Sequence, residues 1–232
     1  TKLAEFGKNR LQLNLMGTVY HGGVVVGLIF TLMFTVVALS IERYFALRTA
    51  FGKSSLTKFV QEVKAAVKAN DFNKARELCN KQQGSVANVV LASVNAYSEM
   101  ENTTGIKKSQ KVAKIQQAHE EATQLEMPTL QMNLPIIATI VTLGTLTALF
   151  GTVLGMIGSF QALAAGGGGD SMALSLGISE ALVNTASGIA TSWVAVVAYN
   201  TYTNKIDKLT YALDEVGYTI AQTYEANHTE EA

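Results

Sequence analysis

The sequence predicts an all-α integral membrane protein, with three transmembrane helices that extend into long cytoplasmic helices. Only 16% of its 232 residues are charged and 48% are hydrophobic, whereas a soluble domain carries about 25% charged residues. Charged residues are also missing from two long stretches and nearly missing from a third, and each stretch exceeds the roughly 20 residues that a helix needs to cross a bilayer. The chain holds two prolines, which suits long helices because proline interrupts a helix interior.

The charge balance and the reactive side chains exclude several classes of function. Eighteen Lys and Arg balance eighteen Asp and Glu, so no net positive charge points to a nucleic-acid partner. A single cysteine, Cys79, excludes a disulfide framework within the chain and a cysteine-rich zinc site. The three histidines are scattered in the sequence. We therefore expect no metal site and no nucleic-acid partner.

The positions of the charged residues define the predicted segments. No Asp, Glu, Lys or Arg lies between Arg10 and Glu42 or between Glu126 and Asp170, and Glu180 is the one charged residue at positions 172–203. The predicted segments are an N-terminal amphipathic segment at the membrane surface (1–22), a first span (23–42), a cytoplasmic helical domain (43–132), a second span (133–160), a glycine-rich periplasmic loop (161–171), a third span (172–203) and a cytoplasmic C-terminal helix and tail (204–232).

The basic residues predict the orientation of the chain. Three spans place the termini on opposite sides of the membrane. Thirteen Lys and Arg lie between the first and second spans and two follow the third span, against three before the first span. By the positive-inside rule, the N-terminus faces the periplasm and the C-terminus faces the cytoplasm.

The predicted cytoplasmic segments have helical periodicity. Residues 56–67 place Leu56, Phe59 and Val63 on one side, and Ser54 or Ser55 is a candidate cap for this helix. Asn70 and Asp71 are expected to end it. Further helices are predicted up to Gly84, over residues 85–100 and 106–127, and over residues 205–226 as a continuation of the third span.

Two sets of polar residues recur at helical spacing in the second and third spans. Residues seven apart on a helix differ by only about 20°, so Thr145, Thr152 and Ser159 share one side of the second span. Four residues of the third span fall within about 60° by the same arithmetic: Glu180, Asn184, Ser187 and Thr191. Thr185 and Ser192 form a second polar edge. Because hydrocarbon disfavours polar stripes, they should face a water-filled cavity or another polar helix.

Small residues in the same spans predict close helix packing. Gly151, Gly155 and Ser159 are spaced four apart in the second span, and the third span repeats the pattern from Gly177. A structural explanation also exists for the hydroxyls, because Ser and Thr in membrane helices often bond only to the carbonyl four residues earlier. Glu180 is different, since an ionisable group within a span marks an ion or proton pathway by default.

These two segments resemble a known family. Residues 149–157 read LFGTVLGMI and residues 178–190 read ISEALVNTASGIA, which is similar to the signature of the MotA/TolQ/ExbB proton channel family, closest to its ExbB/TolQ branch. The chain departs from the family pattern in GTLTAL at residues 144–149, where Ala-Pro-Leu-Leu-Gly-Leu is usual, and in the glycine run of the predicted loop.

The resemblance implies a proton-driven motor in the bacterial inner membrane. It implies a homopentamer whose second and third spans form a helical bundle around a central pore. Two copies of an ExbD- or TolR-like single-span protein would occupy that pore, and each would supply a membrane Asp. By resemblance, Thr152, Glu180 and Thr185 line the proton pathway, protons are the coupling ion without other cofactors, and a TonB-like protein transmits the energy to outer-membrane transporters.

Other functions remain open at the level of the sequence. A TolQ-like stator for envelope maintenance or a gliding-type motor shares these motifs. A membrane scaffold that transports nothing would use the polar stripes only for hydrogen bonds between helices or subunits, surrounded by membrane lipids. We do not expect an enzyme, because the glycine run lacks the Lys-Ser/Thr of a phosphate loop and no nucleophile–base set is visible in the sequence.

Overall fold

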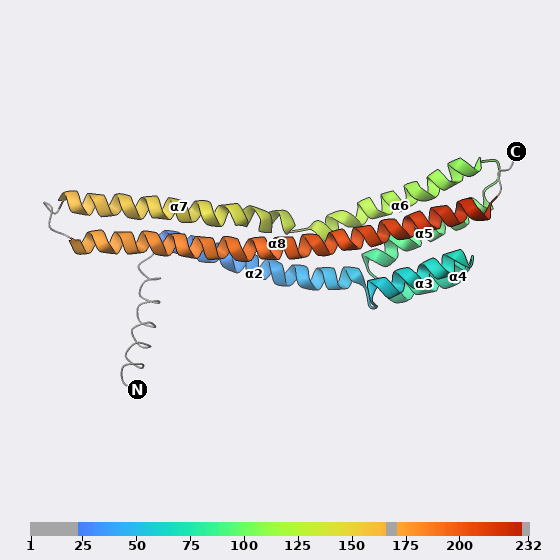
Figure 1. Ribbon diagram of the computed structural model, residues 1–232, viewed down its shortest axis with the longest axis horizontal. Coiled ribbons are helices and arrows are strands. Elements are labelled where there is room, and N and C mark those ends of the chain that lie inside the picture. Colours follow the sequence, from blue (N-terminus) through green and yellow to red (C-terminus); the bar gives the residue numbers. More distant parts are fainter. Residues whose placement is uncertain (1–22, 166–170, 229–232) are drawn as a thin grey trace, which may run out of the picture. The chain divides into compact units, whose positions relative to one another are not determined.

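The described part of the protein is helical throughout. The computed structural model describes residues 23–165 and 171–228, and within these ranges it contains helices and no strands (Figure 1). The helices are α2 (Gly23–Phe51), α3 (Leu56–Lys68), α4 (Phe72–Gln82), α5 (Ser85–Asn102), α6 (Lys108–Gln131), α7 (Leu134–Ala165) and α8 (Ser171–Asn227). The predicted all-α fold class is confirmed. The predicted amphipathic segment at residues 1–22 and the glycine run at residues 166–169 lie outside the described residues.

Three of the helices are long and apolar enough to cross a membrane, as the sequence predicted. They are α2, α7 and α8. The third of these is one continuous helix of 57 residues, so the predicted third span and the predicted C-terminal helix are parts of α8. α7 continues to Ala165, so residues 161–165 at the start of the predicted loop are helical.

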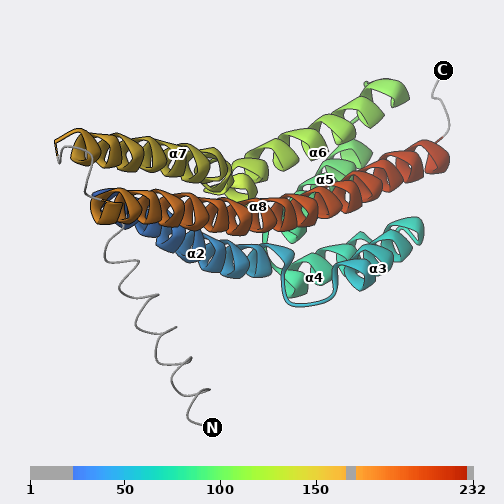
Figure 2. The ribbon, with the colours of Figure 1, turned by 60° about the vertical axis from the view of Figure 1, so that its left-hand side comes forward.

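The chain divides into two compact units. Unit 1 contains the chain up to Ile41 together with Asn133–Asn200, and unit 2 contains Glu42–Met132 together with Thr201–Ala232. Within unit 1, α7 and the first part of α8 run antiparallel and side by side (Figures 1 and 2). Val26, Ile29 and Val36 of α2 are buried in this unit. One side of α2 therefore packs inside unit 1, and the opposite side is exposed.

Unit 2 has an aliphatic and aromatic core built by α3 to α6 and the later part of α8. Val63 of α3, Val90 of α5 and Leu213 of α8 are almost completely buried. Tyr97 and Tyr224 pack edge to face with ring centroids 4.8 Å apart, and the Tyr224 hydroxyl donates to the Met100 carbonyl at 3.2 Å. The buried tyrosine thus satisfies its hydroxyl, as a polar group removed from water requires.

The turn from α2 to α3 is held by one buried side chain, Gln82 at the end of α4. Its Nε2 donates to the carbonyls of Phe51 at 2.7 Å and Ser54 at 3.1 Å. Its Oε1 accepts from the Ser54 backbone N–H at 3.2 Å and from the Ser54 hydroxyl. The predicted serine cap is therefore wrong in its chemistry: Ser55 occupies the N-cap position of α3 without a capping hydrogen bond, while Ser54 binds Gln82.

The break between α3 and α4 follows the predicted residues. α3 ends at Lys68, and Asn70 adopts a left-handed conformation with φ 57°, which asparagine tolerates better than most residues. Asp71 then caps α4, because its side chain accepts a hydrogen bond from the Lys74 backbone N–H at 3.0 Å. Asn70 and Asp71 thus end one helix and begin the next.

A buried histidine joins three helices of unit 2. The Ser93 hydroxyl of α5 donates to the Val89 carbonyl at 3.0 Å and lies 2.9 Å from His119 Nδ1 of α6. His119 Nε2 is buried without a hydrogen-bond partner among the described residues and lies against Gly217 of α8. Burial lowers the pKa of His119, and the weaker opposing effects come from Asp214 and Glu120.

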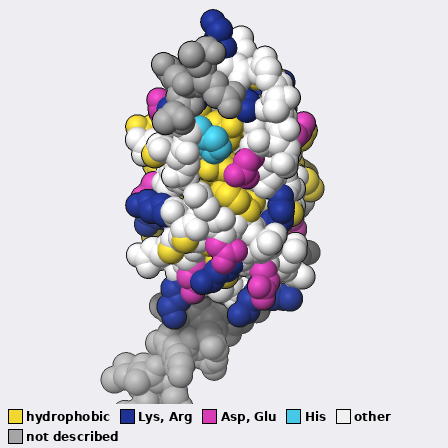
Figure 3. All heavy atoms as spheres, turned by 90° about the vertical axis from the view of Figure 1, so that its right-hand side faces the viewer, with side chains coloured by type: hydrophobic (Ala, Val, Ile, Leu, Met, Phe, Trp, Pro, Cys, Tyr) yellow, Lys and Arg dark blue, Asp and Glu magenta, His cyan; other side chains and the backbone are white. Residues whose placement is uncertain are grey.

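The face of unit 2 seen in Figure 3 is of mixed charge. Figure 3 shows acidic and basic side chains interspersed, with hydrophobic side chains between them. The even mixture agrees with the equal numbers of acidic and basic residues in the sequence.

Replacing Gln82 should loosen α4 in a way that Cys79 reports. Gln82→Ala removes a buried group that satisfies two carbonyls, at a cost of about 1–3 kcal/mol. Cys79 is buried one turn away, and burial raises the pKa of its thiol to about 12, so it reacts slowly with maleimides while α4 is closed. We expect Gln82→Ala to increase the labelling rate about tenfold or more. Gln116→Ala, at an exposed position of α6, is the matched control, and equal rates in the two variants would contradict the role of Gln82.

Protonation of His119 should destabilise the fold. Its pKa is lower in the folded chain than in the unfolded chain, so the unfolded chain binds more protons as the pH falls below about 6.5. We expect the melting temperature to fall between pH 8 and pH 5.5, and to fall less in His119→Gln. Circular dichroism melts of the full chain in detergent measure this difference. His228→Gln should follow the wild-type pH dependence, and an unchanged pH dependence in His119→Gln would refute the prediction.

Candidate functional site

The central feature of unit 1 is a close approach of the α7 and α8 backbones. A Cβ built on Gly188 would lie 2.6 Å from the Gly144 carbonyl oxygen, and one built on Gly155 would lie 3.1 Å from the Gly177 carbonyl oxygen. Such distances leave no room for a side chain at Gly188 and little at Gly155. The predicted pattern of small residues therefore forms a single α7–α8 seam, as small residues do where membrane helices pack closely.

The seam brings Thr152 and Thr185 together. Their Oγ1 atoms are 2.5 Å apart. Thr152 Oγ1 also lies 2.9 Å from the Ala148 carbonyl oxygen, and Thr185 Oγ1 lies 3.2 Å from the Ala181 carbonyl oxygen. Two hydroxyls have two protons and four lone pairs, so the pair retains capacity to accept a proton or a hydrogen bond from a further group.

A second pair of hydroxyls lies two helical turns along the seam. Thr145 Oγ1 is 2.9 Å from Ser192 Oγ. Thr145 precedes Thr152 by seven residues and Ser192 follows Thr185 by seven, which corresponds to about 10 Å along each antiparallel helix. Thr145 and Ser192 therefore repeat the contact that Thr152 and Thr185 make. The sequence placed Ser192 on the same polar edge as Thr185 through its seven-residue spacing, but gave it no role in the proton pathway.

Ser159 does not form a third pair of hydroxyls. It is buried, and its hydroxyl donates to the Gly155 carbonyl of its own helix at 2.8 Å. Across the seam it meets Gly177, where a side chain would collide with the Ser159 hydroxyl. This residue fits the structural explanation of a hydroxyl that bonds one turn back.

Two residues of the other polar edge of α8, Asn184 and Thr191, are buried inside unit 1. Asn184 is 1% exposed, and its side chain lies beside Gly151 of α7, as does Val25 of α2. Asn184 Oδ1 has no hydrogen-bond partner among the described residues. Thr191 is completely buried, and its hydroxyl donates to the Ser187 carbonyl at 2.9 Å. Asn184 and Thr191 therefore lie among the helices of one subunit.

Glu180 reaches the beginning of α2. A Cβ on Gly23 would lie 2.5 Å from Glu180 Oε1, and Gly23 has φ 66°. The carboxyl group of Glu180 is thus next to the first described residue of α2. Glu180 and the Thr152–Thr185 pair lie on different edges of α8, as the helical arithmetic predicted.

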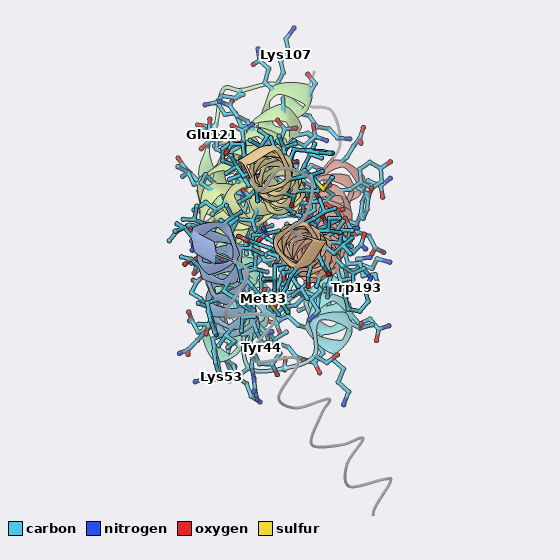
Figure 4. All side chains as sticks on the ribbon, turned by 90° about the vertical axis from the view of Figure 1, so that its left-hand side faces the viewer. Met33, Tyr44, Lys53, Lys107, Glu121 and Trp193 are labelled. Atoms are coloured by element: carbon cyan, nitrogen blue, oxygen red, sulfur yellow. The ribbon has the colours of Figure 1, made fainter. Side chains whose placement is uncertain are left out.

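The outer faces of these helices carry large apolar side chains. Figure 4 looks along unit 1 and shows α2, α7 and α8 side by side as a group of three. Leu149, Phe150 and Phe160 of α7 are each about 60% exposed, and Trp193 of α8 is 67% exposed and points outward. These faces suit contact with lipid or with further membrane helices. The described residues contain no cluster of His, Cys, Asp or Glu that could hold a metal ion.

Comparisons with known proteins find relatives that agree with one another on the family. The family model of the MotA/TolQ/ExbB proton channel family matches residues 83–215. The Tol-Pal system protein TolQ of Pseudomonas aeruginosa is 25% identical over 222 residues, which cover 92% of this chain and 91% of that protein. A putative biopolymer transport protein ExbB-like 3 of Synechocystis is 34% identical over 87 residues, which cover 37% of this chain and 41% of that protein.

A third relative agrees. The Tol-Pal system protein TolQ of Haemophilus influenzae is 32% identical over 84 residues, which cover 36% of this chain and 37% of that protein. The matched family region spans more than half of the chain and contains α7, the Thr152–Thr185 pair and Glu180. The chain belongs to the MotA/TolQ/ExbB proton channel family.

Proposed function

We propose that this chain is the proton-channel subunit of a stator driven by the protonmotive force, of the ExbB/TolQ type. The family is one of membrane proton channels and not of enzymes. The observation that carries the proposal is the Thr152–Thr185 pair, with hydroxyl oxygens 2.5 Å apart across a seam of two apolar helix segments in which Glu180 is the one charged residue. Hydroxyls that share one hydrogen bond can accept a proton on one side and release one on the other.

The hydroxyl pair needs an acid as its proton carrier. Apart from Glu42 at the end of the first span, Glu180 is the one Asp or Glu in the predicted spans, and it lies on another edge of α8, next to Gly23. We therefore propose that the carrier is a membrane Asp of an ExbD- or TolR-like single-span partner, which would take up protons beside Thr152 and Thr185. Glu180 belongs to the same pathway or tunes it by holding the start of α2.

The assembly that we propose is a homopentamer that encloses two copies of this partner, in the bacterial inner membrane. The exposed apolar faces of α2, α7 and α8 support an assembly of several subunits. The distribution of Lys and Arg supports a periplasmic N-terminus and a cytoplasmic C-terminus. Thr145 and Ser187 would serve as secondary polar contacts beside the pore. Ser159, Asn184 and Thr191, which are buried within the subunit, would serve as polar contacts between its helices.

Two downstream partners fit this stator. The first is a TonB-like protein that energises active transport across the outer membrane, as the resemblance to the ExbB branch implies. The second is a Tol-Pal system, which is favoured by the similarity to the Pseudomonas aeruginosa TolQ over 92% of the chain. In a deletion strain, loss of energy-dependent uptake with an intact envelope identifies the first, and detergent sensitivity with normal uptake identifies the second.

Native mass spectrometry tests the assembly. We expect the complex from its own host membranes to hold five copies of this chain and two of a small single-span protein with a membrane Asp. A homo-oligomer that never retains such a partner would favour a scaffold without transport.

Removing the hydroxyl pair should block proton flow without unfolding the chain. Thr152→Val and Thr185→Val keep the side-chain volume close to that of threonine and leave the close α7–α8 contact intact. We expect each to reduce proton flux about tenfold or more in vesicles that contain the complete complex, measured with a pH-sensitive dye. Thr139→Val is the matched control, because within the described part of the chain the Thr139 hydroxyl donates only to the Pro135 carbonyl of its own helix. Undiminished flux in both seam variants would refute the assigned roles.

A further inference from the structure

Unit 2 contains a cavity that the proton pathway does not use. Its volume is about 760 Å³, within the range of small-molecule sites. One side of α2, one side of α3 and one side of α8 line it. We refer to it as the α2–α3–α8 cavity. Its apolar lining includes Leu47, Phe51, Leu56, Val60 and Ala212.

The charged residues of the cavity are mostly basic. Arg48, Lys64, Lys205 and Lys208 line it together with one acid, Glu215. Lys64 and Glu215 form an ion pair. Lys205 Nζ lies 5.9 Å from the ring centroid of Tyr44 and 5.8 Å from that of Tyr202, so two aromatic rings hold its ammonium in the cavity.

Two cations of the cavity are not neutralised. No carboxylate of the described residues lies within ion-pair distance of Arg48 or Lys208. Both side chains are exposed. The cavity thus combines an apolar lining with uncompensated positive charge, and the complementary ligand is an anion that carries an apolar part.

The cavity begins where the apolar helix segments end. The charge-free part of α2 ends at Ile41, one turn before Tyr44, and that of α8 ends just before Lys205. At 1.5 Å per residue, Arg48 lies about 10 Å beyond Ile41 along α2. Tyrosine and basic side chains at such positions are typical of a membrane interface. A ligand in this cavity would therefore meet the polar surface of the bilayer.

We propose that the α2–α3–α8 cavity binds the head group of an anionic phospholipid of the cytoplasmic leaflet. The phosphate diester contacts Arg48, Lys205 and Lys208, and the glycerol with its first methylenes packs on the apolar lining. Basic pockets beside membrane helices recognise anionic lipids by this chemistry. The inference rests on the proposed membrane orientation and is independent of proton conduction.

Native mass spectrometry of the detergent-solubilised complex tests the proposal. The purified complex is titrated with phosphatidylglycerol or phosphatidylethanolamine of identical acyl chains. We expect selective retention of phosphatidylglycerol. Each basic residue near a membrane surface contributes roughly 1 kcal/mol toward anionic lipid, so Arg48→Gln/Lys208→Gln should weaken retention about tenfold or more.

Two further variants make the test specific. Lys53→Gln/Lys58→Gln removes the same charge from two exposed lysines that follow Arg48 in the sequence and do not line the cavity, and Lys53 is labelled in Figure 4. This control should retain the lipid as the wild type does. Ala212→Phe fills the cavity without changing its charge and should also reduce retention. The oligomer mass and the circular dichroism melt verify that each variant is folded.

Several results would overturn the proposal. Equal retention of the two lipids would show that this site does not recognise the charge of the head group. The same conclusion would follow if Arg48→Gln/Lys208→Gln and its control lost equal amounts of bound lipid. Full retention in Ala212→Phe would place the lipid on the surface outside the cavity. Displacement of the lipid by millimolar inorganic phosphate alone would identify a free anion as the ligand. A cavity covered by a second copy of this chain would retain neither lipid selectively.

Discussion

The close approach of α7 and α8 is the constraint on which the rest of unit 1 depends. Gly188 touches the Gly144 backbone so closely that a side chain at Gly188 would collide with it. Only at this separation do short hydroxyl side chains such as Thr152 and Thr185 reach each other across two helices. In a membrane, apolar side chains gain little by leaving lipid, so close packing and interhelical hydrogen bonds must hold the helices together. The seam is therefore at once the packing contact and the polar site.

Unit 2 is subject to a different constraint, because water competes for the hydrogen bonds of its polar groups. It buries an aliphatic and aromatic core and bonds several of the polar groups inside it to near neighbours. Gln82 pairs with Phe51 and Ser54 at the turn from α2 to α3, and Ser93 lies within hydrogen-bond distance of His119 Nδ1. His119 Nε2 has no hydrogen-bond partner among the described residues and lies against Gly217, and burial lowers the pKa of this imidazole.

Both units place their polar chemistry on α8. This helix carries Thr185 and Ser192 in unit 1, and Lys205 and Lys208 in unit 2. Its sequence changes from small and hydroxyl residues to charged residues a short distance beyond Asn200. The change follows the solvent that each part meets, because a lysine is tolerated where its ammonium reaches the membrane surface and is costly deeper in hydrocarbon.

The sequence by itself determined the all-α class, the three apolar helices and the two polar edges of α8, because each follows from the period of one helix. The sequence also predicted the helix break at Asn70 and Asp71, because this break depends on local backbone preference and on capping. The tertiary structure alone decided which residues meet: Ser192 with Thr145, Glu180 with the start of α2, and Ser54 with Gln82 in place of a serine cap. The basic cavity between α2, α3 and α8 also required it. Such contacts join residues far apart in sequence, and helical periodicity carries no information about the register between helices.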